Sequence, residues 1–339
     1  MTAVNCTADK VKGWMMRALT WIVLIVGVLY CGYWFVAARQ AETATLQALA
    51  EAEARGLEVR HQGLSIAGFP NRFDLTLTEP DVYHMQSGTG WRAPFLQVFA
   101  LSYAPWNLIA ALPNEQVLSL QGQSVTVNST RMQASLFLRP RPSLPVRDVK
   151  WVAEGASLRS DAGWSMGFAS ANLSLVGTEP GAEVAFRVLD LVPDQQISAQ
   201  LSSAGLPAAI GRIDALADLT LDRPVTLRET PPAVQAIAVR EAHLDWGPVK
   251  VTGKGEVHAD ALGFAEGTIE LRIAGWRTAY DAARAAGLLP ERMAIAVGSV
   301  LEHLASRSGE PDSIDLPLVM QQGRMMLGPM PLGPAPRLR

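Results

Sequence analysis

The sequence has little cysteine and little charge, and both shortages exclude classes of function. Its two cysteines, Cys6 and Cys31, lie in or before the first long apolar segment, so the rest of the chain cannot form an internal disulfide, a thiol-based active site or a cysteine metal site. Charged residues make up 18% of the chain, the net charge is −3, and no basic stripe is interleaved with aromatic residues. We therefore expect no nucleic-acid partner, and the apolar content of 49% is typical of a folded domain.

Charge is absent altogether between Arg17 and Arg39. At about 1.5 Å of helix per residue, the apolar stretch 18–38 matches the roughly 30 Å hydrocarbon layer of a membrane. Its Trp and Tyr residues gather toward the ends, as membrane-interface anchors do. The sequence therefore predicts one transmembrane anchor at residues 18–38.

The charges that flank this stretch predict its orientation. Lys10, Lys12 and Arg17 precede it, whereas Arg39 is accompanied by Glu42 on the other side. Because positively charged flanks stay in the cytoplasm, residues 1–17 are predicted to be cytoplasmic and residues 57–339 periplasmic. This makes the chain a single-pass protein of the inner (plasma) membrane.

Two other interpretations of the N-terminus compete with an anchor. A signal peptidase would find small residues at Val36-Ala37-Ala38, but the apolar stretch exceeds the roughly 7–15 residues of a cleaved signal. Lipidation at Cys31 would require a small residue where Tyr30 stands. An uncleaved anchor is therefore favoured, with Cys31 an ordinary small apolar residue inside the helix.

Residues 39–56 are predicted to form a short stalk helix after the span. The segment is rich in Ala and Glu, has no Pro, and stops at Gly56, which suits the left-handed position after a helix. Leu46 and Leu49 offer only a thin apolar stripe. We expect this helix to pack lightly against the domain or the bilayer surface.

From Leu57 to about Ala274 the dominant period is two, which predicts strands. Apolar Phe73, Leu75 and Leu77 alternate with polar residues, and Ile213–Leu221 repeats this pattern. Further strands are predicted at Gln97–Tyr103, Met132–Leu138, Ala169–Val176, Val184–Leu189, Val234–Trp246, Val249–Asp260 and Thr268–Ala274. The predicted fold class is mainly β, with a long curled antiparallel sheet that forms a groove, a sandwich or an open barrel.

Helical periodicity returns near the C-terminus. A helix pair is predicted over residues 276–306, with Pro290 opening the second helix. A hairpin is predicted at residues 314–328, followed by an extended proline-rich tail. The periplasmic β-rich domain, residues 57–339, thus includes a helical insert that covers one mouth or edge of the sheet.

No motif in the sequence predicts an active site or a metal centre. Gly163-Trp164-Ser165-Met166-Gly167 matches the nucleophile elbow of hydrolases, but a strand is predicted after it where the elbow needs a helix. His243 and His258 would approach each other in a hairpin about Gly247-Pro248 but have no third ligand. We expect no enzyme activity, no catalytic residue, no metal and no cofactor.

The glycine-rich hairpin at 249–271 favours a curled sheet, because glycine permits bends and the close approach of another backbone. A curled sheet with one apolar face forms a groove suited to an acyl chain. Leu173, Leu219 and Leu271 are the predicted ligand-binding residues. The alternative is that a second sheet or the helices of 276–306 seal this face as a core.

Several segments together resemble one known family. They are the N-terminal span, Gly68-Phe69-Pro70-Asn71-Arg72-Phe73-Asp74-Leu75, the hairpin from Asp245-Trp246-Gly247 to Gly267, Trp276, Leu316-Pro317-Leu318, Gly323-Arg324 and the segment Leu327–Gly333. The chain resembles domain-of-unknown-function family 2125, whose members are proteobacterial membrane-anchored envelope proteins without an assigned activity. More distantly, its glycine-punctuated strands are similar to AsmA-type envelope proteins, which implies an association with phospholipid movement and outer-membrane upkeep.

These observations converge on a non-enzymatic envelope protein that is anchored in the inner membrane and binds lipid or another apolar ligand in a sheet-lined groove. The expected partners are the inner membrane, a phospholipid or other lipid, and envelope proteins. A periplasmic scaffold or assembly partner for other envelope proteins is the alternative. The third hypothesis is a serine hydrolase that uses Ser165.

Overall fold

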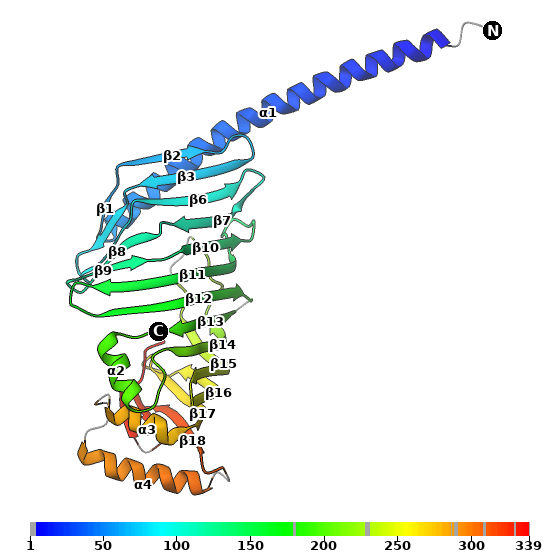
Figure 1. Ribbon diagram of the computed structural model, residues 1–339. Coiled ribbons are helices and arrows are strands. Elements are labelled where there is room, and N and C mark those ends of the chain that lie inside the picture. Colours follow the sequence, from blue (N-terminus) through cyan, green and yellow to red (C-terminus); the bar gives the residue numbers. More distant parts are fainter. Residues whose placement is uncertain are drawn as a thin grey trace.

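The computed structural model describes residues 5–178, 181–227, 231–285, 287, 291–307, 310–328 and 330–338. One long helix precedes a large antiparallel sheet, and shorter helices follow at the far end of the sheet (Figure 1). The mainly β fold class predicted from the sequence is confirmed. Among the described strands the sheet stays open and does not close into a barrel.

Helix α1 (Asn5–Ala54) is continuous from the apolar stretch through the predicted stalk. No proline interrupts it, and the Ala- and Glu-rich residues after Arg39 are strong helix formers, so nothing in the sequence separates two helices. Gly56 follows with φ of +92°, the left-handed conformation expected there. The last part of α1 lies along the first strands of the sheet (Figure 1).

The sheet begins as two arms that share one long strand, β11 (Val146–Ser160). The first arm pairs with residues 146–154 of β11, and the second with residues 157–160, on either side of Gly155. The first arm consists of β2 (Gly63–Ala67), β3 (Arg72–Thr78), β6 (Phe95–Leu101), β7 (Ala104–Leu112) and β10 (Arg131–Leu138). The second arm consists of β1 (Leu57–Arg60), β4 (Asp81–His84), β5 (Thr89–Arg92), β8 (Glu115–Leu120) and β9 (Gln123–Asn128).

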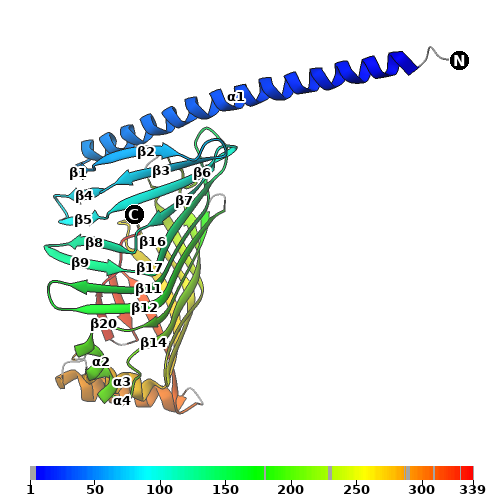
Figure 2. The ribbon, with the colours of Figure 1, turned by 45° about the horizontal axis from the view of Figure 1, so that its top comes forward.

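After β11 the chain continues as an antiparallel meander. Its strands are β12 (Ser165–Gly177), β13 (Gly181–Leu191), β14 (Ile210–Leu221), β15 (Val234–Trp246), β16 (Val249–Ala259), β17 (Ala265–Ala274), β18 (Ser313–Gln321), β19 (Arg324–Leu327) and β20 (Met330–Pro334). Figure 2 shows this sheet strongly bent along its length, with the C-terminal end of the chain inside the bend. The bend gives the sheet an inner and an outer side.

Three short helices lie at the end of the meander: α2 (Gln195–Ser203), α3 (Trp276–Ala285) and α4 (Glu291–Arg307). Helices α3 and α4 occupy the predicted helical insert, while Pro290, the predicted first residue of the second helix, lies outside the described residues. Helix α2 was not predicted. It begins after Asp194, whose carboxylate accepts a hydrogen bond from the Gln196 N–H as an N-cap.

The C-terminal tail differs from the predicted extended segment. The hairpin β18–β19 forms as expected, but residues 330–334 add β20 beside β19 instead of leaving the sheet. Within the described residues β20 pairs on one side only, and an edge strand tolerates the prolines Pro331 and Pro334 because they need not donate on the free side.

Candidate functional site: the apolar inner face of the sheet

One row of side chains crosses the sheet from β2 to β18 and contains only apolar residues and a glycine. Its members are cross-strand partners in register, and we call them the inner row: Ile66, Leu75, Val98, Ala110, Ala134, Trp151, Leu173, Phe186, Ala215, Ala242, Gly253, Leu271 and Leu316. Because side chains alternate between the faces of a strand, these residues share one face.

Two flanking rows on the same face repeat this composition. One contains Leu112, Met132, Ala153, Ala171, Val188, Ile213, Leu244, Val251, Ile273 and Ile314. The other contains Phe73, Ala100, Leu108, Leu136, Val149, Leu175, Val184, Ala217, Val239, Gly255, Ile269, Leu318 and Leu327. None of the residues in these three rows, all within the described part of the chain, carries a charge. We call this surface the inner face.

The outer face is polar where the inner face is apolar. The row next to the inner row, on the other side of the sheet, contains Asn172, Arg187, Asp214, His243, Thr252, Arg272 and Asp315. Ion pairs join neighbouring strands there: Arg212 Nε lies 2.9 Å from an oxygen of Asp245, and Arg240 pairs with Asp218 and Glu183. The hydrogen bond with Glu183 raises the pKa of Arg240 above its ordinary value. Ion pairs between neighbouring strands therefore offset part of the charge of the outer face.

Helices and the C-terminal segment cover one end of the inner face. Val297 and Leu301 of α4, together with Trp276, pack against Ile314 and Leu316 in a buried cluster. A second cluster joins α2 and α3 to β16 through Leu201, Ala282 and Val249, and a third joins the C-terminal segment to Val257 and Met320 through Ala335. This end is a sealed core, as the alternative interpretation of the sequence required.

The second arm contacts the inner face toward its other end. Gln116 of β8 is buried and donates through Nε2 to the sulfur of Met132, a member of a flanking row, at 3.3 Å. Its Oε1 accepts a hydrogen bond from Trp91 Nε1 at 2.8 Å. These contacts place residues of the second arm over the inner face of the first arm.

Between these two regions, two members of the inner row are exposed. Leu173 of β12 and Phe186 of β13 are direct cross-strand partners, and 42% and 41% of their surfaces remain accessible. Leu316, in the same row, is only 3% exposed. Contiguous apolar surface of this kind marks an interaction site more often than scattered apolar residues do.

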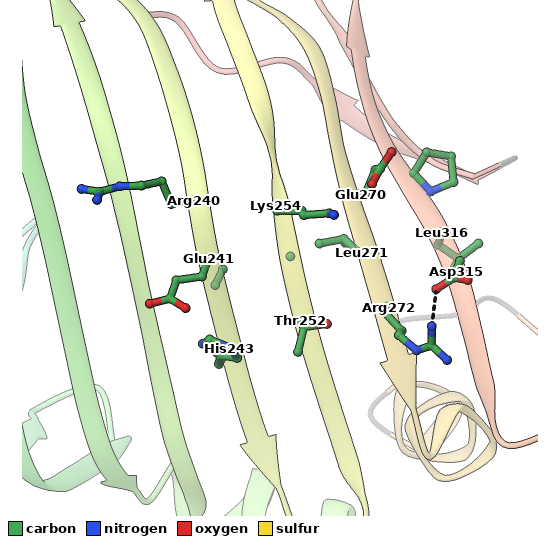
Figure 3. A pocket seen from close by; sticks show the side chains of 13 residues that line it. Arg240, Glu241, His243, Thr252, Lys254, Glu270, Leu271, Arg272, Asp315 and Leu316 are labelled. Carbon is green, nitrogen blue, oxygen red and sulfur yellow. Dashed lines mark ion pairs between the residues drawn. The ribbon is translucent and has the colours of Figure 1, made fainter. Parts of the chain in front are cut away.

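The hollow in Figure 3 lies along strands β15 to β18 and is lined by residues of both faces of the sheet. It has a volume of about 650 Å³ and is lined by Arg240, Glu241, His243, Thr252, Lys254, Glu270, Arg272, Asp315 and Pro317, with Ala242, Gly253, Leu271 and Leu316 between them along the strands. The latter four belong to the inner row. Arg272 pairs with Asp315 and Glu310, and the hydrogen bond from Arg272 lowers the pKa of Glu310.

The structure brings the three predicted ligand-binding residues to one face. Leu173 and Leu271 belong to the inner row, and Leu219 pairs with Ile237 on the same face, near the C-terminal cluster. Leu173 is exposed, whereas Leu219 and Leu271 are half-buried. Sequence reasoning missed Trp151 and Phe186, although Phe186 stands between Val184 and Val188 at the alternating positions that mark an apolar face.

The glycines of the 249–271 hairpin serve the packing of the sheet itself. A Cβ on Gly253 would stand 2.9 Å from Leu271 Cδ2, so Leu271 lies over this glycine. At Gly255, with φ of +154°, a Cβ would collide with the backbone of Thr268 on β17. Glycine thus allows the close approach of a neighbouring strand.

Neither Ser165 nor the pair His243 and His258 lies in the arrangement that a catalytic or metal site would need. Ser165 is the first residue of β12, a strand rather than the helix of a nucleophile elbow, and its N–H donates to Asp194 Oδ2 at 2.9 Å. In the β15–β16 hairpin, His243 lies opposite Thr252 and His258 opposite Ala236, so the hairpin keeps the two histidines apart. His243 lies instead 3.3 Å from a carboxylate oxygen of Asp214.

The comparison with family models adds an assignment to this geometry. No curated protein and no solved structure shows a significant match to the chain. Residues 34–336 match the model of a family described as an uncharacterized protein conserved in bacteria. The match begins within the apolar stretch of α1, covers both arms and the whole meander, and ends after β20. The chain therefore belongs to the DUF2125 family.

Proposed function

We propose that this protein is a non-enzymatic, membrane-anchored envelope protein that holds the acyl chain of a lipid, or a similar apolar ligand, on the exposed part of its inner face. The observation that carries the proposal is the accessibility of Leu173 and Phe186 in a row of apolar side chains whose far end, at Leu316, is covered by helices. An acyl chain is long, flexible and uncharged, which matches a surface that offers apolar contact and no charge.

The energetics favour an occupant on this surface. Full burial of a Leu or Phe side chain contributes about 1.5–3 kcal/mol, and each buried methylene of a ligand about 0.8 kcal/mol. Trp151, Leu173, Phe186 and Ala215 are consecutive members of the inner row, so a ligand lying across their strands would gain contact with each in turn. The alternating positions on the outer face offer paired charges instead.

Helix α1 supports the membrane anchor. It is long and apolar enough to cross a membrane, with a mean hydropathy of 2.1 over its most apolar window. Large apolar side chains such as Leu19, Val23 and Val28 are exposed in the structure, and a lipid bilayer would bury them. With the basic residues before the span inside, the sheet would lie on the periplasmic side of the inner membrane.

Native mass spectrometry of the full chain, released from membranes, tests lipid binding. Lipid bound around α1 contributes equally to every variant, so the readout is the difference between the wild type and Phe186→Ser. Asn172→Ser, an exposed change on the outer face beside Leu173, is the matched control. We expect Phe186→Ser to lose a lipid that the wild type and the control retain, and a folded wild type with no more lipid than Phe186→Ser would contradict the proposal.

A scaffold for other envelope proteins is the second candidate, and β20 is the observation that favours it. This strand has one unpaired edge within the described residues, and Leu332 on it is exposed. Crosslinking in membranes that captures stoichiometric protein partners through β20, with no lipid on the inner face, would favour the scaffold.

A further inference from the structure

Helix α1 is fixed to the domain by an aromatic residue near the end of the apolar stretch. Trp34 is only 5% exposed, and its Nε1 donates to the backbone oxygen of Arg72 at 2.8 Å. Its ring stacks on Phe73 at 5.7 Å and meets Phe69 edge-on at 5.4 Å. These contacts tie α1 to the turn between β2 and β3.

Two tyrosines tie the same part of α1 to a second turn. Tyr30 Oη lies 2.6 Å from Ser102 Oγ, and the Tyr33 hydroxyl donates to the backbone oxygen of Ser102 at 2.7 Å. Ser102 belongs to the turn between β6 and β7 and is fully buried. Because Arg72, the first residue of β3, pairs with Leu101, the last residue of β6, both turns lie at the same end of the sheet.

Both turns also present exposed aromatic side chains beside α1. Tyr103 is 68% exposed, and Phe69 is exposed while it stacks on Phe35 of α1 at 5.7 Å. Exposure alone does not distinguish these two turns from others, because Met85, in the turn between β4 and β5, is 73% exposed. The distinction is the position of α1, which is hydrogen-bonded to both turns through Tyr30, Tyr33 and Trp34 and continues beyond the sheet (Figure 1).

Geometry along α1 places these turns at the membrane surface. Tyr30, Tyr33 and Trp34 lie inside the charge-free stretch that ends at Ala38, and Trp34 precedes Ala38 by about 6 Å of helix. Aromatic residues favour the membrane–water interface, and interfacial elements sink about 5–10 Å into the head-group region. A turn held level with Trp34 therefore falls within this layer.

We infer that the β2–β3 and β6–β7 turns enter the interface of the membrane that α1 crosses, with Phe69 and Tyr103 as anchors that fix how the sheet is held on the bilayer. The inference rests on the proposed membrane anchor and is independent of lipid binding on the inner face. The sheet is then held against the membrane rather than tethered at a distance.

Lipid-quenching fluorescence on the full chain tests this placement. In a Cys6→Ala/Cys31→Ala background, an environment-sensitive dye is attached at Leu24→Cys, Tyr103→Cys or Met85→Cys in proteoliposomes that contain phospholipids brominated along the acyl chain. Leu24 reports on the span, and Met85 is the exposed control far from the span, because its neighbour His84 pairs with Leu57, just after the C-terminal end of α1.

We expect strong quenching at Leu24, clear quenching with a blue-shifted emission at Tyr103, and a water-like, unquenched signal at Met85. Quenching at Leu24 with Tyr103 indistinguishable from Met85 would overturn the inference and leave the anchor standing. No quenching at Leu24 would overturn the anchor and the inference with it.

A measurement on the unmodified chain guards against an effect of labelling. In nanodiscs containing a phospholipid with a diazirine on its acyl chain near the head group, we expect covalent adducts on peptides spanning residues 68–72 and 101–104 in addition to α1. Adducts confined to α1 would overturn the inference.

Discussion

Leu173 and Leu316 occupy the same inner row, yet one is 42% and the other 3% exposed. Leu316 packs with α4 in a buried cluster, whereas Leu173 belongs to none of the buried clusters among the described residues. The chain thus covers one part of an apolar face with its own helices and leaves another part accessible. The contrast separates residues that stabilise the fold from those available for binding.

The largest expected effect is at the covered end. Leu316→Ala should lower the free energy of unfolding by about 2–5 kcal/mol, because it opens a cavity beneath α4. The matched change Leu173→Ala should cost less than about 1.5 kcal/mol, since much of that side chain is already in water. Urea unfolding of both variants measures the difference, and equal losses would mean that the exposed part is core after all.

The three predicted ligand-binding leucines sharpen the comparison. Leu173→Ser should lower the melting temperature by no more than about 2 °C, which corresponds to about 1 kcal/mol for a domain of this size, while reducing co-purified lipid. Leu219→Ser and Leu271→Ser should cost more stability, because both side chains are half-buried. Thermal unfolding and lipid extraction on the same samples give the answer. If all three unfold the domain, the groove fails at these positions.

A smaller loss of stability is expected for a substitution at Gly253, a member of the inner row. A Cβ there meets the flexible end of Leu271, which can rotate away, so Gly253→Ala should cost less than about 1 kcal/mol, below the usual range for overpacking. Gly255→Ala is the contrasting variant, because its Cβ meets strand backbone at a positive φ and should destabilise far more. If urea unfolding showed equal losses of stability for the two variants, the Leu271 side chain would be unable to rotate away from residue 253.

The smallest expected effect is a pH-dependent change in stability at Asp194, the N-cap of α2. Hydrogen bonds from the Ser165 and Gln196 N–H groups lower the pKa of Asp194 below its ordinary value of 3.8. A lowered pKa in the folded state stabilises the protein above the ordinary value, and this contribution is lost as the pH falls through the lowered pKa. Asp194→Asn should therefore be slightly less stable than the wild type at pH 7, and the difference should shrink as the pH falls below 3.8 through the lowered pKa. A pH-independent difference in melting temperature would contradict this account.

The strands themselves could be predicted from period-two alternation, because each needs only one apolar face, as at Phe73, Leu75 and Leu77. The helix pair at 276–306 was predicted to cover part of the sheet, but which residues it covers could not be predicted, since Leu173 and Leu316 lie in equally alternating strands and differ only in what packs on them. Helix α2 was missed because its apolar Ile197 and Leu201 span little more than one turn. The division into two arms at β11 depends on pairing between distant strands, which no local pattern encodes.

The most direct test of the central claim is site-specific photocrosslinking in membranes. Benzoylphenylalanine placed at Leu173, on the inner face, and at its neighbour Asn172, on the outer face, probes two exposed positions one residue apart. Mass spectrometry of the full chain should show lipid adducts at position 173 and none at position 172. Equal labelling at both positions, or none at position 173 in a folded protein, would contradict the proposal that the exposed inner face binds lipid.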